Sequence, residues 1–149
     1  MAKDSAAIHM VVCDAGPLIH LDELGTLELL GDFQSVLVPD AVWIEVEQHR
    51  PDLFGQTTGT FARIVPQRPP AASLAALARL VPLHLGETQA LQIAEEHRAD
   101  PLLADDTAAR LAAKQTGLSV HGTLGILLRA IRRQQREPRT PSPRNSSKQ

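Results

Sequence analysis

Apolar residues fall into two alternating patterns along the chain. Short continuous runs rich in Val, Ile and Leu are typical of buried strands, and longer segments with an apolar residue every three or four positions are typical of helices. Strands that alternate with helices predict a parallel sheet joined by right-handed crossovers. The runs predict strands over residues 8–13, 35–38, 61–66, 101–104 and 118–122, and the longer segments predict helices over residues 15–33, 41–48, 71–80, 85–98, 106–115 and 123–135.

Several helix ends carry their usual sequence signals. Gly25 is expected to divide the first helical segment into two short helices. Asp40 is placed as the N-cap of the helix that follows the second strand, and Asp105 as the N-cap of the helix that begins at Asp106. Gly117 follows that helix at the position where a glycine commonly ends one. The third predicted strand is expected at an edge of the sheet.

Composition and length favour one domain with an aliphatic core. The chain has 149 residues, of which 43% are hydrophobic and only 3% aromatic. We assign residues 1–136 to this domain and residues 137–149, which lack apolar side chains, to a disordered basic C-terminal tail. The single Cys13 excludes an internal disulfide, and no segment is typical of a signal peptide or a membrane-spanning helix. We therefore expect a cytoplasmic protein without a membrane partner.

Charge is distributed unevenly along the chain. Residues 129–149 hold seven Lys and Arg against one acid, whereas residues 1–128 hold eight against 16. Four arginines share one face of the last predicted helix and are candidate contacts for an RNA backbone. They are Arg129, Arg132, Arg133 and Arg136. A solvated helix face and tail is the alternative, and charge alone does not separate the two.

Acidic residues recur where predicted strands pass into helices. Asp14 ends the first strand, and the adjacent Asp105 and Asp106 follow the fourth. Glu45 lies in the helix after the second strand, and Glu87 lies in the first turn of the helix before the fourth. Ligands of parallel sheets bind beyond the carboxyl ends of the strands, so these acids are expected to converge on one cleft. Clustered carboxylates repel one another, and their oxygens favour Mg²⁺ or Mn²⁺, which can orient a water for phosphodiester displacement.

Each acid taken alone also has a structural interpretation, which stays open at this point. Asp14 and Asp105 precede helices and are suited to cap them. Glu87 lies where an acid interacts well with the helix dipole. Glu45 could be a solvated helix residue like its neighbour Glu47. Only the joint pattern favours a site, and no Cys or His spacing indicates zinc.

Five segments in a fixed order resemble the PIN-domain superfamily, in particular a PIN-like branch related to the VapC-type ribonuclease toxins. They are VVCDAGPLI, VPDAVWIEV, LGETQALQIA, LLADDTAARLAA and GTLGILLRA. The resemblance covers residues 9–133 and implies a three-layer α/β/α sandwich with a central, mainly parallel sheet. It also implies a Mg²⁺- or Mn²⁺-dependent endoribonuclease that hydrolyses RNA phosphodiester bonds, and a toxin of a type II toxin–antitoxin pair.

The resemblance also implies roles for individual residues. Four acids match the family's catalytic, metal-binding positions: Asp14, Glu45, Glu87 and Asp106. Ala104 stands where the toxins have the Thr of a Thr-x-Asp motif, so Asp105 is retained as a further metal ligand. Thr123 stands where a hydroxyl or an acid supports the metal-bound water, although it is equally suited to be an ordinary first residue of a helix. His121 is interpreted as a core residue at a strand end rather than a ligand.

The sequence also indicates partners for the protein and leaves two other protein classes to be weighed. The resemblance implies an RNA substrate, a cognate antitoxin and a second copy of the chain as partners. A phosphorelay receiver is also a parallel α/β domain with clustered acids, but its paired acids follow the first strand and a Lys follows a late one. Here the pair is late, and no Lys lies directly after the last strand. A catalytically inactive PIN-like module that binds nucleic acid or protein stays open.

Overall fold

The computed structural model of the chain describes residues 10–56 and 61–136. The predicted tail at 137–149 and the first two residues of the first predicted strand lie outside the described residues. No helix within the described ranges is long and apolar enough to cross a membrane. The elements in chain order are β1 (Met10–Cys13), α1 (Ala15–Glu23), the 3₁₀ helix η1 (Leu27–Asp32), β2 (Ser35–Pro39), α2 (Asp40–His49), β3 (Phe61–Ile64), α3 (Ala72–Leu80), α4 (Leu85–His97), β4 (Leu102–Leu103), α5 (Thr107–Gln115), β5 (Val120–His121) and α6 (Thr123–Arg136).

Five strands form one sheet in the order β3-β2-β1-β4-β5, and every neighbouring pair is parallel. β1 is therefore the central strand. Its Val12 is in register with Leu37 of β2 on one side and with Leu102 of β4 on the other. β3 lies at an edge, as predicted. The predicted parallel α/β sheet is confirmed.

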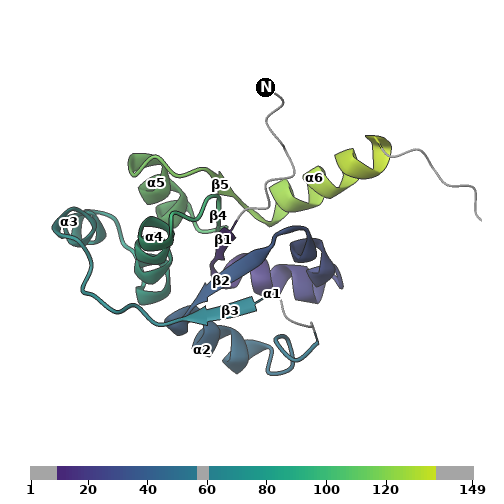
Figure 1. Ribbon diagram of the computed structural model, residues 1–149, viewed down its shortest axis with the longest axis horizontal. Helices are drawn as coiled ribbons and strands as arrows, with labels where there is room; N and C mark the ends of the chain where they lie inside the picture. The colour runs from purple at the N-terminus through teal and green to yellow at the C-terminus, as the bar shows by residue number, and fades with distance from the viewer. Residues whose placement is uncertain (1–9, 57–60, 137–149) are drawn as a thin grey trace, which may run out of the picture.

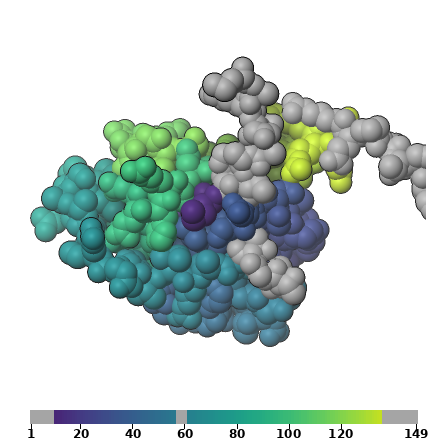
Figure 2. Space-filling view, in the orientation of Figure 1, coloured from purple at the N-terminus to yellow at the C-terminus, as the bar shows by residue number. Residues whose placement is uncertain are grey.

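Helices cover both faces of this sheet (Figure 1). α1, η1, α2 and α6 pack on one face, and α3, α4 and α5 pack on the other. Successive side chains of a strand point to opposite faces, so Val11 and Cys13 of β1 join the first core and Val12 joins the second. Figure 2 shows α3 and α4 at one side of the molecule and α6 at the opposite side. The three-layer sandwich is the predicted architecture.

Two glycines end helical segments as the sequence predicts. Gly25 has a φ of 68° and separates α1 from η1, and Gly117 has a φ of 80° directly after the C-cap of α5. Both lie in the left-handed region that glycine adopts without a steric penalty. A side chain at either position would strain the backbone.

Both predicted aspartate N-caps were wrong. Asp40 is the first residue of α2 rather than its cap, and its carboxylate pairs with Arg63 of the neighbouring β3 at 2.6 Å. Asp106, and not Asp105, is the N-cap of α5, where its Oδ1 accepts a hydrogen bond from the Ala109 backbone N–H at 3.0 Å. The helix therefore begins one residue later than predicted.

The last two strands are shorter than their apolar runs. β4 and β5 hold two residues each, and β5 lies at the edge of the sheet. His121 at the end of β5 is exposed, so its interpretation as a core residue was wrong. A side chain at the end of a two-residue edge strand has no neighbouring strand beyond it, and the start of α6 beside it leaves His121 exposed.

Candidate metal centre

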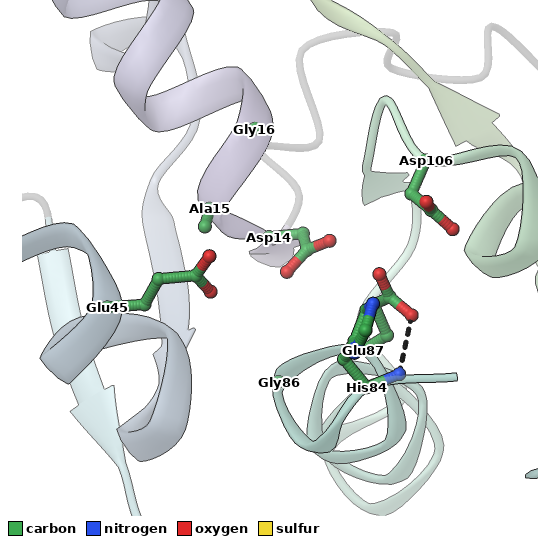
Figure 3. Close-up of a pocket in the computed structure, with 8 residues that line it drawn as sticks. All are labelled: Asp14, Ala15, Gly16, Glu45, His84, Gly86, Glu87 and Asp106. Carbon is green, nitrogen blue, oxygen red and sulfur yellow. Dashed lines mark hydrogen bonds between the residues drawn. The ribbon is translucent and has the colours of Figure 1, made fainter. Parts of the chain in front are cut away.

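A pocket of about 170 Å³ lies at the edge of the sheet where β1 and β4 end (Figure 3). We call it the acidic pocket, because four acids from four separate segments line it. The parallel topology explains the gathering: β1 and β4 both end at this edge, and α4, which leads back to β4, begins there. The lining residues are Asp14, Ala15, Gly16, Glu45, His84, Gly86, Glu87 and Asp106.

Asp14 is one of the two buried acids of the acidic pocket. Its side chain occupies the N-cap position of α1 but accepts no capping hydrogen bond, and the residue is only 7% exposed. Burial raises the pKa of Asp14 to about 6; the Ala15 backbone N–H opposes this shift, and the charges of nearby acids add to it. A carboxylate that is buried without a cap or a cationic partner among these contacts is suited to bind a cation. The capping interpretation therefore does not account for Asp14.

Glu87 is also buried but has a local partner. Its Oε2 accepts a hydrogen bond from the His84 backbone N–H at 2.8 Å, which leaves the other carboxylate oxygen free of that contact. Burial raises the pKa of Glu87; the His84 backbone hydrogen bond opposes the shift, and nearby Asp106 and Glu45 reinforce it. Glu87 thus fastens the start of α4 and also contributes negative charge to the acidic pocket.

Glu45 and Asp106 form the exposed sides of the acidic pocket. Figure 3 shows Glu45 reaching from α2 toward Asp14, with Asp106 on the other side of Asp14 and Glu87. Asp106 combines two functions, because the carboxylate that caps α5 also lines the pocket. The capping and site interpretations of this residue are therefore compatible.

Asp105 does not line the acidic pocket and faces a different set of residues. Its Oδ2 accepts a hydrogen bond from the Thr123 hydroxyl at 2.6 Å and lies 2.8 Å from His20 Nδ1, and its Oδ1 accepts one from the Thr123 backbone N–H at 2.7 Å. A Cβ at Gly122 would lie 2.7 Å from the same Oδ1. Asp105 therefore ties the start of α6 and the side of α1 to the turn after β4. Thr123 directs its hydroxyl to Asp105 and not to the pocket.

His84 lines the acidic pocket and was not singled out from the sequence. It precedes α4 at the N-cap position, three residues before Glu87. The only available signal was this position, because a single His without a spaced partner does not resemble a metal-binding motif. Its imidazole is the one nitrogen-bearing side chain among the lining residues.

The donor set of the acidic pocket fits a hard divalent cation. Carboxylate oxygens are the preferred ligands of Mg²⁺ and Mn²⁺, and a cation would offset the burial and the nearby negative charges that raise the pKa of Asp14. Within the described residues, no three His, Cys, Asp or Glu side chains are close enough to hold one ion together. A cation in this geometry would therefore have few direct protein ligands and complete its shell with water, as Mg²⁺ commonly does.

The predicted arginine face on α6 is partly engaged by the protein itself. The Arg129 guanidinium lies 5.5 Å from the centre of the Phe33 ring, and Arg133 pairs with Asp32 of η1. Arg132 is exposed. Arg136 is the last residue of α6. Two of the four arginines thus fasten α6 to the body of the molecule.

Comparisons with known proteins agree with the fold of the chain. Among solved structures, the chain is similar to a PilT N-terminus domain protein from the hyperthermophilic archaeon Sulfolobus solfataricus P2, with 15% identity, a TM-score of 0.61 and coverage of 89% of this chain and 99% of that one. It is also similar to PAE2754 from Pyrobaculum aerophilum, with 14% identity, a TM-score of 0.57 and coverage of 88% and 94%. No curated protein matches the chain. The family model of the PIN domain matches residues 10–140, and the chain therefore belongs to the PIN-domain family.

Proposed function

We propose that this PIN-domain protein is a Mg²⁺- or Mn²⁺-dependent nuclease, specifically an endoribonuclease that hydrolyses RNA phosphodiester bonds. PIN domains are commonly nucleases, which supports the general class. The observation that carries the specific proposal is the convergence of Asp14, Glu45, Glu87 and Asp106 on one pocket, with Asp14 buried and its pKa raised. A protein gains nothing in stability from such an arrangement unless a cation occupies it.

The four acids would divide the work of the site by their surroundings. Asp14 is buried directly after the central strand, where its backbone N–H donates to the Leu103 carbonyl at 2.8 Å, and it would be the principal ligand of the cation. Glu87 and Asp106 each have one oxygen engaged by a backbone N–H, which fixes the carboxylate and leaves the other oxygen to bind the cation or its waters. Glu45 is exposed at the rim and would orient a water beside the scissile phosphate. A bound divalent cation supplies a water of lowered pKa and neutralises the charge that develops on the phosphate.

Cleavage by wild type and by Asp14→Asn tests the proposal. We expect wild type to cleave single-stranded RNA with Mn²⁺ and not with EDTA. Asp14→Asn should lower the rate at least about 100-fold, because metal activation supplies several kcal/mol to the transition state. The matched control is Asp52→Asn, which removes an exposed carboxylate away from the pocket and should cleave like wild type. A DNA strand of the same sequence tests the preference for RNA.

Either of two results would reject the proposal. Wild type that binds Mn²⁺ and cleaves no RNA would exclude a nuclease. Asp14→Asn that cleaves as fast as wild type would remove Asp14 from the site.

The alternative function is a catalytically inactive module that binds nucleic acid or protein. The spacing of the acids favours it, since no three of them within the described ranges can hold one ion together. Isothermal titration with Mn²⁺ separates the two functions. The nuclease proposal requires binding that Asp14→Asn weakens, whereas the inactive module requires none.

The resemblance to VapC-type toxins extends the proposal to a cellular role. On this proposal the protein acts in the cytoplasm as the toxin of a type II pair, has a cognate antitoxin as partner and forms a homodimer. Expression in bacterial cells should then arrest growth, and Asp14→Asn should relieve the arrest. Growth that is unaffected by an active nuclease would exclude the toxin role and leave the nuclease proposal in place.

A further inference from the structure

A second hollow adjoins the acidic pocket where α2 meets the start of α4. We call it the α2–α4 groove. It has a volume of about 490 Å³ and is lined by Ala41, Ile44, Glu45, His84, Leu85 and Gly86. Glu45, His84 and Gly86 line both hollows, so the groove continues directly from the acidic pocket.

Two contacts fix the floor of the α2–α4 groove. A Cβ at Gly86 would lie 3.0 Å from Val42 Cγ2, so only glycine lets α4 approach α2 this closely without displacing a neighbour. The Gln89 side-chain oxygen accepts a hydrogen bond from the Ala41 backbone N–H at 3.0 Å, which satisfies a donor in the first turn of α2. The groove is therefore a preformed feature of the helix pair, as binding sites usually are.

The walls of the groove differ from those of the acidic pocket. Ile44 is 44% exposed and Leu85 is 67% exposed, so two large apolar side chains face solvent beside a cluster of carboxylates. Apolar side chains exposed at a binding site are typical of a surface that a ligand covers. His84 adds an imidazole at the boundary of the two hollows, and nucleobases stack on such rings.

We propose that the α2–α4 groove binds one unpaired nucleobase of the RNA strand, on the nucleotide next to the phosphate at the acidic pocket. This inference rests on the proposed function. The two adjoining hollows match the two parts of a nucleotide: the charged phosphate belongs with the acids and their cation, and the flat apolar base belongs between Ile44 and Leu85. A base inside a duplex is paired and stacked, so the groove selects a single strand.

Binding measurements on Asp14→Asn test the groove without cleavage of the probe. The probe is a dye-labelled single-stranded oligoribonucleotide with Mg²⁺, compared with versions in which one base at a time is missing. We expect one missing base to weaken binding about tenfold, which is the scale of a stacked base. Adding Leu85→Ser should weaken binding of the intact probe similarly and have little further effect on the probe without that base.

A control variant and a cleavage measurement distinguish failure of the groove proposal from failure of the nuclease proposal. Leu80→Ser replaces an 84% exposed leucine on α3, outside the groove. It should change the affinity neither for the intact probe nor for the probe that lacks one base. Equal binding of all probes, no measurable binding, or additive effects of Leu85→Ser and the missing base would overturn the groove proposal. Wild type is then given the same probes with Mn²⁺. If no RNA is cleaved but Leu85→Ser and the missing base still act non-additively on binding, the nuclease is rejected and the groove is supported. If RNA is cleaved but the two changes act additively, the groove is rejected and the nuclease is supported.

Discussion

Burial and the negative charges of nearby acids both raise the pKa of Asp14. The side chain is 7% exposed, and Glu87, Glu45 and Asp106 lie near enough to raise its pKa further. Its pKa of about 6 in the folded protein compares with an ordinary value of 3.8. Without a cation, the ionised carboxylate therefore destabilises the folded state at neutral pH.

Replacing this carboxylate should stabilise the metal-free protein. Asp14 favours folding below about pH 4, where it is protonated in both states, and this advantage is lost as the pH rises through about 6. In EDTA at pH 7.5, Asp14→Asn should exceed wild type in unfolding free energy by up to about 3 kcal/mol, and the two should converge near pH 4. Urea unfolding measures both. A variant less stable than wild type at pH 7.5 would contradict the prediction, and Asp52→Asn is the control.

The sequence predicted which acids gather at one sheet edge, but not which of two adjacent acids faces the acidic pocket. Asp14 and Asp106 could be placed because each follows a strand that ends at the same sheet edge. The neighbours Asp105 and Asp106 could not be separated, since one step along an irregular backbone turns a side chain toward different elements. Asp105 contacts α1 and α6, whereas Asp106 caps α5 and lines the acidic pocket.

Among the elements, α1 and α6 are joined at the carboxylate of Asp105. Burial raises the pKa of Asp105, but the hydrogen bonds from Thr123 and His20 outweigh burial and lower it below the ordinary value. These bonds satisfy the Thr123 N–H at the start of α6, where a helix has free donors. One side chain thus links two helices beside the sheet edge that carries the acidic pocket.

Asp105→Ala should therefore destabilise the fold. Loss of the acceptor leaves the Thr123 donors unsatisfied, at a cost of roughly 1–3 kcal/mol. Because the pKa of Asp105 is lowered, its contribution is present at neutral pH and is lost as the pH falls below its ordinary value of 3.8. Urea unfolding of wild type and Asp105→Ala at pH 7 and pH 3 measures the difference, which should shrink in acid. Equal stability of wild type and Asp105→Ala at pH 7 would show that the contacts of Asp105 do not stabilise the fold. Asp52→Ala is the control.

α6 offers a test of the predicted RNA face. Arg133 is paired with Asp32, so the exposed Arg132 is the cleaner position for charge reversal. If Arg132 contacts phosphate, Arg132→Glu should weaken RNA binding. The slope of log affinity against log salt concentration should also become shallower by about 1 or more. Fluorescence anisotropy from about 50 to about 200 mM salt measures it, because phosphate contacts lose much of their affinity over this range. The exposed Arg79 on α3 provides the control variant Arg79→Glu. Unchanged affinity would support the solvated-face interpretation.

For the whole molecule, the apolar pattern was sufficient for the architecture and insufficient for its details. The continuous run around Val12 predicted a strand buried on both faces, and β1 is that strand. The run over residues 118–122 gave only the two-residue β5, because an apolar run shows that a segment is buried but not how many of its residues pair with the next strand. Which helix covers which face, and the groove between α2 and α4, depend on contacts between distant segments that no local pattern encodes.

The central place of β1 has a consequence for synthesis. β1 leaves the ribosome before its two neighbours, and β4 follows only after β2, β3, α3 and α4. Until β4 and α5 emerge, the nascent chain has three of the five strands and no Asp106 beside Asp14, so the acidic pocket is incomplete. On the proposed function, the nascent chain therefore gains its nuclease site only when the segment around Asp106 has emerged and packed beside β1.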